Sequence, residues 1–207
     1  MANDMNCIIY LVRSSDKDIE EFNKSLSLLE ENLLKYTTAD IIVFVEDSFE
    51  KYKSKVKTNL ELLYQIIEFK TPDYPKEIKD NIPEFYPHPT HGNGPIEWGH
   101  PGFTMGYRHM CRMFSGEFYK FPIVQKYEYY IRLDTDSFIH TPLEYDIFKW
   151  AKDNECWYGY VAPAVQQDNA KVVEGLWDFV NEHYPNNIPD RWMYYTNWEL
   201  GKVDWFL

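Results

Sequence analysis

Hydrophobic and polar positions follow two periods along this chain, one typical of buried strands and one of amphipathic helices. Continuous apolar runs at 7–12, 40–45 and 129–133 predict strands that are covered on both faces. Between the first two runs, apolar residues recur at spacings of three and four, which predicts a helix capped at Ser15 or Asp16. The apolar stripe of this helix consists of Ile19, Phe22, Leu26, Leu29 and Leu33. Strand, helix and strand in this order form a right-handed βαβ unit, so the pattern favours an α/β fold.

Weaker patterns predict the remaining elements and one long loop. The loop is 71–102, which holds seven of the 12 prolines and no hydrophobic period, and we interpret it as a functional loop or an insertion. The further elements are a short helix at 49–56, a strand at 64–69, a helix at 103–120 with its apolar stripe at Tyr107, Met110, Cys111, Phe114 and Phe118, a helix at 144–151, a strand at 156–161 and a helix at 171–183. No repeat or linker interrupts the series. We therefore expect one domain spanning 1–207, a mixed sheet flanked by helices.

The charge balance is acidic and limits the classes of partner. The 207 residues include 21 Lys and Arg against 33 Asp and Glu, which gives a net charge of −12. An acidic chain repels phosphate backbones, so we expect no nucleic acid partner, and an anionic nucleotide would need a metal ion or local arginines. Aromatic residues make up 18% of the chain, which suits stacking on sugar rings and equally suits a tyrosine-rich core.

Cysteine usage and hydropathy narrow the class further. The three cysteines are far apart and form no Cys-x-x-Cys pair, so neither a zinc site nor a disulfide framework is indicated. No apolar run approaches 18 residues, and the first strand begins almost at the N-terminus, without a signal peptide. We expect no membrane segment in this chain, which as written is soluble, and cytoplasmic if complete.

The strongest candidate chemistry follows the strand at 129–133. Asp134 and Asp136 lie one residue apart where this strand ends, so both carboxylates point to the same side and can reach one cation. Hard divalent ions such as Mn²⁺ or Mg²⁺ prefer these oxygen ligands, and many sugar-nucleotide transferases hold their metal in this way. An acidic turn without a metal is the alternative. Arg13 follows the first strand at the edge where ligands bind, so it is a nucleotide-contact candidate or a solvated arginine. Arg132 either braces the site or forms a structural ion pair.

The residues around the acidic pair carry a more specific signature. The helix contains Tyr-Arg-His-Met-Cys-Arg-Met at 107–113, and the strand contains Tyr-Ile-Arg-Leu-Asp-Thr-Asp at 130–136. Both segments resemble motifs of the fungal α-1,2-mannosyltransferase family of the Kre2/Mnt1 type (glycosyltransferase family 15), whose strand motif ends in Glu-Pro-Asp. Asp134 stands in place of that glutamate and is one methylene shorter, which leaves the donor preference open. The resemblance extends in order over nearly the whole chain, through the segments 11–14, 43–49 and 196–200.

The resemblance implies a GT-A-like (Rossmann-like) fold and a retaining transfer of mannose from GDP-mannose to an oligosaccharide or glycoprotein acceptor, with Mn²⁺. By position it makes Glu199 the candidate nucleophile and Tyr107 a substrate contact, beside Arg13, Arg132 and Asp134. Members of the family continue past the position of Leu207, through a segment with a histidine metal ligand, and begin with a Golgi membrane anchor. We therefore interpret the sequence as a fragment or a shortened relative, placed in the Golgi lumen if an anchor is missing.

Alternatives stay open for several of these residues. Without the family resemblance Glu199 would be interpreted as an exposed carboxylate near the C-terminus, and packing on the apolar stripe would account for Tyr107. As a nucleophile Glu199 would form a covalent mannosyl-enzyme, whereas same-face attack would need it only to stabilise positive charge. Three tryptophans form either an acceptor platform or a small core: Trp192, Trp198 and Trp205. For the whole chain, the rivals are a non-catalytic binder of nucleotide sugar or glycan and a transferase that uses another nucleotide sugar.

Overall fold

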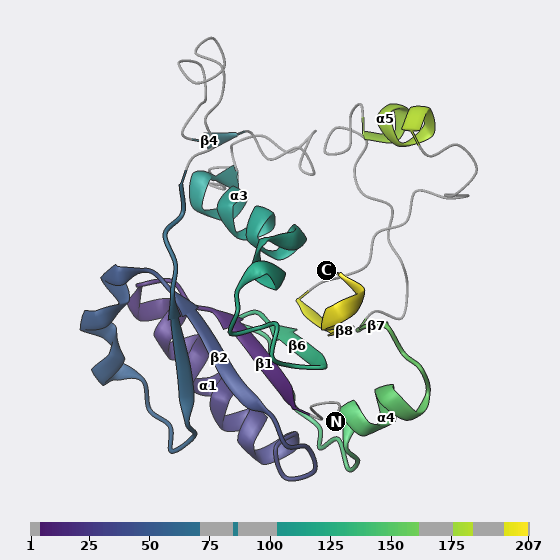
Figure 1. Cartoon of the computed structure of the whole chain (residues 1–207). Helices are drawn as coiled ribbons and strands as arrows, with labels where there is room; N and C mark the ends of the chain where they lie inside the picture. Colours follow the sequence, from purple (N-terminus) through teal and green to yellow (C-terminus); the bar gives the residue numbers. More distant parts are fainter. Residues whose placement is uncertain (1–4, 71–84, 87–102, 162–175, 184–196, 207) are drawn as a thin grey trace. The chain divides into compact units, whose positions relative to one another are not determined.

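The computed structural model describes residues 5–70, 85–86, 103–161, 176–183 and 197–206 (Figure 1). The chain divides into two compact units. The first consists of Met1–Lys70, Met113–Val161 and Thr196–Leu207, and the second of Thr71–Arg112 and Ala162–Tyr195. The assignment of 1–207 to one domain stays a prediction. Most of the predicted loop at 71–102, the start of the predicted helix at 171–183, and Trp192 lie outside the described residues.

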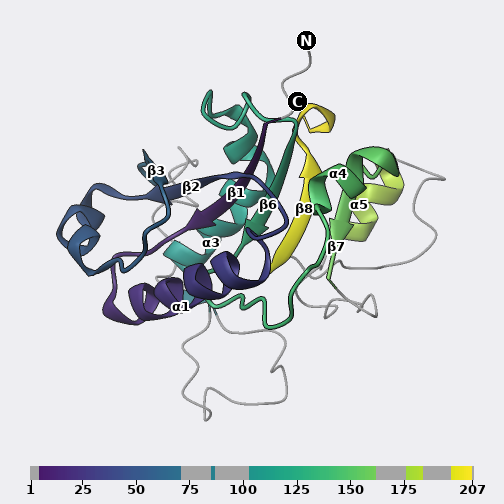
Figure 2. The same ribbon diagram turned by 90° about the horizontal axis from the view of Figure 1, so that it is seen from below.

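A six-stranded mixed sheet forms the centre of the first unit, in the order β3-β2-β1-β6-β8-β7 (Figure 2). Its strands are β1 (Asn6–Leu11), β2 (Asp40–Val45), β3 (Leu62–Ile66), β6 (Tyr129–Leu133), β7 (Tyr158–Tyr160) and β8 (Trp198–Lys202). The first four strands in spatial order run parallel, and β8 then pairs antiparallel with both β6 and β7. The predicted α/β class with a mixed sheet is confirmed.

Two helices cover one face of this sheet. Helix α1 (Asp16–Asn32) begins at Ser15, whose hydroxyl accepts a hydrogen bond from the Asp18 backbone N–H, and it buries all of the predicted apolar stripe. Helix α4 (Ile147–Asp153) is capped in the same way by Asp146. Their apolar side chains join the inward residues of β1, β2 and β6 in one core. The βαβ prediction for the N-terminal part of the chain is therefore confirmed.

Residues 113–120, which precede β6 in the chain, cover the opposite face. They make a wide turn, η4 (Met113–Glu117), and a 3-10 turn, η5 (Phe118–Lys120), whose side chains form a second core with Cys7, Ile9 and Phe44. The prediction of one helix over 103–120 is wrong, because the backbone at Gly116 is non-helical and the helix ends at Arg112. Residues beyond that point pack in the core of the first unit, which overrides the continued helical period.

The second unit contributes four described elements. The short strands β4 (Phe85–Tyr86) and β5 (Phe103–Thr104) pair antiparallel, and helix α3 (Met105–Arg112) follows directly. Helix α5 (Leu176–His183) is also in this unit. Two residues of the predicted stripe, Tyr107 and Cys111, are exposed on α3, whereas His109 is buried, so the predicted buried face of this helix is wrong.

Three smaller differences from the predicted elements affect the first unit. Strand β3 begins two residues before the predicted strand at 64–69 and ends at Ile66, and the predicted short helix is a 3-10 helix, η1 (Asp47–Lys55). Strand β8 was not predicted at all, and a 3-10 turn, η6 (Val203–Trp205), follows it. Among the residues that the structure describes, no helix is both long and apolar enough to cross a bilayer.

Candidate active site

Strand β6 places Tyr130, Arg132 and the first aspartate after the strand on one face of the sheet, because side chains alternate along an extended chain. Arg132 is buried, and its Nη2 donates to Oδ1 of Asp134 at 2.7 Å. The centroid of the Phe114 ring lies 3.8 Å from the guanidinium carbon, in a cation–π contact. Nε of Arg132 is buried without a hydrogen-bond partner in the described part of the chain. Arg132 is thus both an ion-pair partner of Asp134 and a buried cation at the candidate site.

The start of β8 lies beside the end of β6 and brings Glu199 opposite Arg132 in the antiparallel register. Two hydrogen bonds attach the acidic turn after β6 to the residue before β8. The Asp134 N–H donates to the Asn197 carbonyl at 3.1 Å, and the Ser137 hydroxyl donates to the same oxygen at 2.8 Å. The structure therefore brings Arg132, Asp134 and Glu199 together at one edge of the sheet, although the two strands are far apart in the sequence.

Glu199 is buried, which shows that its alternative interpretation as an exposed carboxylate is wrong. Its Oε2 accepts a hydrogen bond from the Tyr158 hydroxyl at 2.9 Å, and its Oε1 accepts a longer one from the Tyr130 hydroxyl at 3.4 Å. Burial raises the pKa of Glu199 above its ordinary value, whereas the charge of Arg132 and the two phenol hydrogen bonds act in the opposite direction. The glutamate is therefore partly desolvated but still supplied with donors that stabilise its anion.

Asp134 and Asp136 are the predicted metal ligands of the site. Burial raises the pKa of Asp134, the Arg132 cation opposes this rise, and the Asp136 charge adds to it. Asp136 is exposed. Within the described ranges, no cluster of three or more histidine, cysteine, aspartate or glutamate side chains could hold a metal ion. Two carboxylates still fit Mn²⁺ or Mg²⁺, since such ions are commonly held by one or two carboxylates with water and substrate phosphates.

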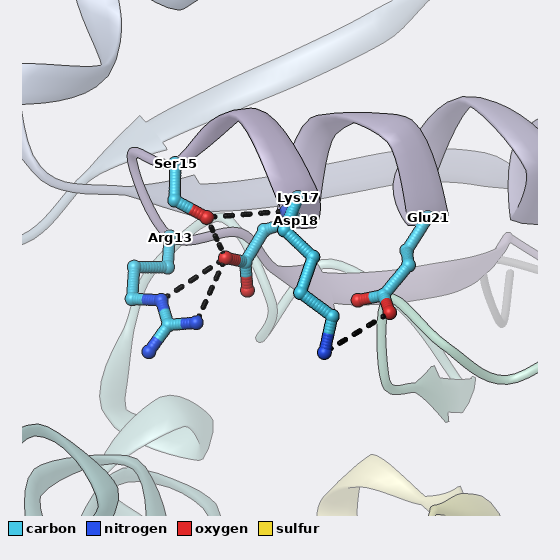
Figure 3. Close-up of polar contacts among 5 residues, drawn as sticks. All are labelled: Arg13, Ser15, Lys17, Asp18 and Glu21. Carbon is cyan, nitrogen blue, oxygen red and sulfur yellow. Dashed lines mark hydrogen bonds and ion pairs between the residues drawn. The ribbon is translucent and has the colours of Figure 1, made fainter.

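Arg13 leaves the sheet at the same edge as Asp134, because β1 and β6 are adjacent and parallel. Its exposed guanidinium donates from Nε and Nη2 to Oδ2 of Asp18, at 3.1 and 2.9 Å (Figure 3). Asp18 also bonds the Ser15 hydroxyl, so Arg13 extends the N-cap of α1. The role of Arg13 as a nucleotide contact stays a prediction, and its partner in this structure is the Asp18 carboxylate.

Tyr107 belongs to the second unit, on α3, where 45% of its side chain is exposed. The alternative that it only packs in a core is wrong, and its role as a substrate contact stays a prediction. Of the tryptophans, Trp198 packs against the core under α1 and α4, whereas Trp205 is exposed beside Trp157, with ring centroids 6.1 Å apart. Trp198 therefore follows the core interpretation.

Sequence reasoning missed the aromatic residues that surround Glu199. Tyr130 faces Gly201 across the β6–β8 ladder, and a Cβ added at Gly201 would lie 2.3 Å from its ring. Tyr158 comes from β7, and the Tyr119 hydroxyl lies 2.5 Å from that of Tyr130. The glycine in the unpredicted strand was the available signal, because a glycine inside a strand often marks the close approach of another group.

This arrangement is the one expected of a GT-A-like domain. It consists of a mixed α/β sheet, two carboxylates after the parallel strand β6, and a buried glutamate on β8, the neighbouring strand in the sheet. A family model described as glycolipid 2-alpha-mannosyltransferase matches residues 2–206, and the chain belongs to this family.

Individual relatives cover less of the chain. The O-glycoside alpha-1,2-mannosyltransferase omh1 of Schizosaccharomyces pombe is 34% identical over 119 residues, which is 48% of this chain and 30% of omh1. Homolog 5 of the same enzyme and organism is 25% identical over 195 residues, 91% of this chain and 44% of the relative. The chain thus spans less than half the length of these two relatives.

Two solved structures share the fold. The mannosyltransferase Ktr4p from S. cerevisiae superposes with a TM-score of 0.70 at 23% identity, over 98% of this chain and 57% of that one. Core-mannan synthase A from Aspergillus fumigatus, in its Mn/GDP form, gives 0.69 at 21% identity, over 97% of this chain and 60% of that one. At these identities the likeness establishes the fold alone.

Proposed function

We propose that this chain transfers mannose from GDP-mannose to a hydroxyl of an oligosaccharide or glycoprotein, with retention of configuration. The observation that carries the proposal is the convergence of Arg132, Asp134 and Glu199 at one edge of the sheet. The family and the names of its relatives support mannose as the sugar. A metal and a guanine nucleotide are supported by the Mn/GDP form of core-mannan synthase A and by the GDP complex of Ktr4p.

Asp134 and Asp136 are the residues that would hold Mn²⁺ or Mg²⁺. When bound, the ion would neutralise the negative charge that develops on the departing diphosphate. Arg132 orients Asp134 through the 2.7 Å hydrogen bond and adds a positive charge next to the same carboxylate. Arg13 at the same edge and Tyr107 of the second unit are the proposed contacts to nucleotide or substrate.

Glu199 is the proposed catalytic carboxylate. In a two-step reaction its oxygen bonds to the anomeric carbon while the bond from that carbon to GDP breaks. The acceptor hydroxyl then displaces the glutamate and gives up its proton to the departed diphosphate or to water. In a same-face reaction the carboxylate stabilises the positive charge of the sugar ring without bonding to it. Both routes need Glu199 as an anion, and the donors around it favour that form.

Calorimetric titration of GDP-mannose, with and without Mn²⁺, tests the donor site. We expect metal-dependent binding that is lost in Asp134→Asn and Asp136→Asn. Asp153→Asn is a matched control, because Asp153 is an exposed carboxylate on α4 that pairs with Lys149. Metal-independent binding, or no binding to the wild-type chain, would contradict the proposed donor site.

Transfer itself is tested with GDP-[¹⁴C]mannose and a panel of mannoside acceptors, and we expect Glu199→Gln to abolish it. Turnover with UDP-sugars but not with GDP-mannose would overturn the choice of donor. Metal-dependent binding without transfer to any acceptor would instead indicate a nucleotide-sugar binding domain.

A further inference from the structure

Three phenols form a hydrogen-bonded cluster at Glu199, and the proposed reaction steps give none of them a role at the substrate. The hydroxyls of Tyr158 and Tyr130 lie 2.9 and 3.4 Å from the two carboxylate oxygens. The Tyr119 hydroxyl lies 2.5 Å from that of Tyr130. The three residues come from different elements, β7, β6 and η5, and each is at least half-buried. We call Tyr119, Tyr130 and Tyr158 the phenol cluster.

The direction of these hydrogen bonds follows from the chemistry of the acceptor. An ionised carboxylate can only accept, so Tyr158 and Tyr130 must both donate to Glu199. Tyr130 has a single hydroxyl proton, and that proton points to Glu199. In the short contact between the phenols, Tyr119 is therefore the donor and Tyr130 the acceptor. All of these hydrogen bonds are therefore directed toward Glu199, and this direction stabilises the ionised carboxylate.

The phenol cluster is held in place by packing. The ring of Phe206 stacks on Tyr119 with centroids 4.6 Å apart and an interplanar angle of 8°. It also contacts the rings of Tyr130 and Tyr158 edge-on, at 6.3 and 6.1 Å. Gly201 leaves the room that the Tyr130 ring occupies. The hydroxyls are thus positioned by the second core and the sheet, and Glu199 is held in turn by them.

We infer that Tyr158 and Tyr130, supported by Tyr119, are positioning residues that hold Glu199 ionised and in a single orientation for sugar transfer. This inference rests on the proposed function, since it assigns the cluster to the same glutamate. Phenol donors are suited to this role because they stabilise an anion without bringing a second positive charge. A cation in direct contact with Glu199 would weaken the carboxylate's attraction for the positive charge that develops on the sugar ring.

Other charged groups also face Glu199, and each of them raises or lowers its pKa. Arg132 on β6 favours the anion, whereas Asp134 and burial disfavour it. Among the described residues, no hydrogen bond or ion pair joins Glu199 to Asp134 or Asp136. Removal of the Tyr158 hydroxyl leaves Arg132 and Asp134 unchanged and takes away one donor, so Glu199 should become easier to protonate.

A direct test follows the Glu199 carboxyl by NMR in protein labelled with ¹³C-glutamate, with the resonance assigned by its loss in Glu199→Gln. We expect Tyr158→Phe to raise the pKa of Glu199 by about one unit, because a hydrogen bond to a charged group is worth about a tenfold change in an equilibrium constant or more. Tyr10→Phe is the matched control, since Tyr10 is a buried phenol that bonds Ser25 at 2.9 Å in the other core. An unchanged Glu199 pKa in Tyr158→Phe would overturn the inference.

Steady-state kinetics provide a second test of the positioning role. With GDP-mannose as donor, Tyr158→Phe should move the acidic limb of the rate profile about one unit to higher pH. On that limb kcat should fall about tenfold, while KM changes less than about twofold. Tyr10→Phe should leave the profile in place. If Tyr158→Phe does not fold, Tyr130→Phe removes the longer bond and should give a smaller shift in the same direction.

The two proposals can fail separately. If the wild-type chain transfers no mannose, the proposed function fails, and the NMR titration still tests the phenol cluster without turnover. If the wild-type chain transfers mannose but Tyr158→Phe and Tyr130→Phe have the wild-type pH profile and the wild-type Glu199 pKa, the cluster is only structural and the inference fails.

Discussion

Replacement of Gly201 by alanine tests the packing on which the site depends. An added Cβ would lie 2.3 Å from Cε1 of Tyr130 and 2.6 Å from both Cζ and the hydroxyl oxygen. Carbon atoms in contact prefer about 3.5–4.0 Å, so the ring would have to move by roughly 1 Å or more. It has little room, because Tyr119 and Phe206 pack against it. Overpacking of this kind costs about 1–3 kcal/mol, and we expect Gly201→Ala to fall in the upper half of that range.

Urea unfolding, followed by tryptophan fluorescence, measures this cost. Gly159→Ala is a matched control on the neighbouring strand, where an added Cβ would meet its nearest atoms at 3.7 and 3.9 Å, in ordinary contact. It should change the free energy of unfolding by less than about 1 kcal/mol. Because the displaced ring carries a Glu199 hydrogen bond, Gly201→Ala should also impair transfer.

A double variant shows whether the Tyr130 ring is the cause. Tyr130→Val removes all three atoms that a Cβ at Gly201 would meet, so Gly201→Ala should cost little in that background. The difference between the two costs is the coupling between the residues, and we expect it to exceed about 1 kcal/mol. An equal cost in both backgrounds, or equal stability of Gly201→Ala and Gly159→Ala, would refute the reasoning.

Three further predictions concern charge and capping. Arg132→Met leaves the Asp134 carboxylate without its ion-pair partner, and we expect it to lower the free energy of unfolding in urea by about 2 kcal/mol. This cost is smaller than that of breaking a fully buried pair, because the Asp134 side chain is 29% exposed. Burial raises the pKa of Glu199, so the stability linked to its proton is present below its ordinary value of 4.5 and is lost as pH rises through the folded-state pKa. As pH rises from acid to neutral, the free energy of unfolding of the wild type should therefore fall relative to that of Glu199→Gln. A difference between the two proteins that does not change with pH would contradict the raised pKa. Ser15→Ala should lower the free energy of unfolding by about 1 kcal/mol through the lost N-cap. Arg13→Ala should lower it by less than about 0.5 kcal/mol, because the ion pair of Arg13 with Asp18 is exposed. The affinity of Arg13→Ala for GDP-mannose tests the proposed nucleotide contact of Arg13 separately.

The elements that could be predicted from the sequence are those whose local pattern is also their tertiary pattern. Strands β2 and β6 have the predicted bounds, because fully buried strands leave uninterrupted apolar runs. Helix α1 has the predicted stripe and its cap at Ser15. The ion pair offered as one interpretation of Arg132 is confirmed by its 2.7 Å hydrogen bond to Asp134, whereas the shared direction of the Asp134 and Asp136 carboxylates stays a prediction.

Strand β8 could not be predicted because its stability is not local. Its sequence, Trp-Glu-Leu-Gly-Lys, contains a glycine and two charged residues, which are all poor strand formers. Pairing with β6 and β7, and burial of Glu199 and Leu200, make it a strand nevertheless. The resemblance to a known family identified Glu199 as a candidate, but only the pairing shows which side chains hold it. The phenol cluster was missed for the same reason.

The antiparallel direction of β8 is what lets one sheet edge hold both the acidic turn and Glu199. In a parallel sheet only the ends of strands reach the ligand-binding edge, whereas an antiparallel neighbour brings its beginning there. Arg132 near the end of β6 therefore lies opposite Glu199 near the beginning of β8, and Tyr130 lies opposite Gly201. The same ladder thus fixes the position of the carboxylate and of one of its donors. Gly201→Ala disturbs the packing of this ladder, whereas Tyr158→Phe removes a hydrogen-bond donor to Glu199 without adding an atom to the ladder. Comparison of the two variants separates the part of transfer that depends on the sheet from the part that depends on the charge of Glu199.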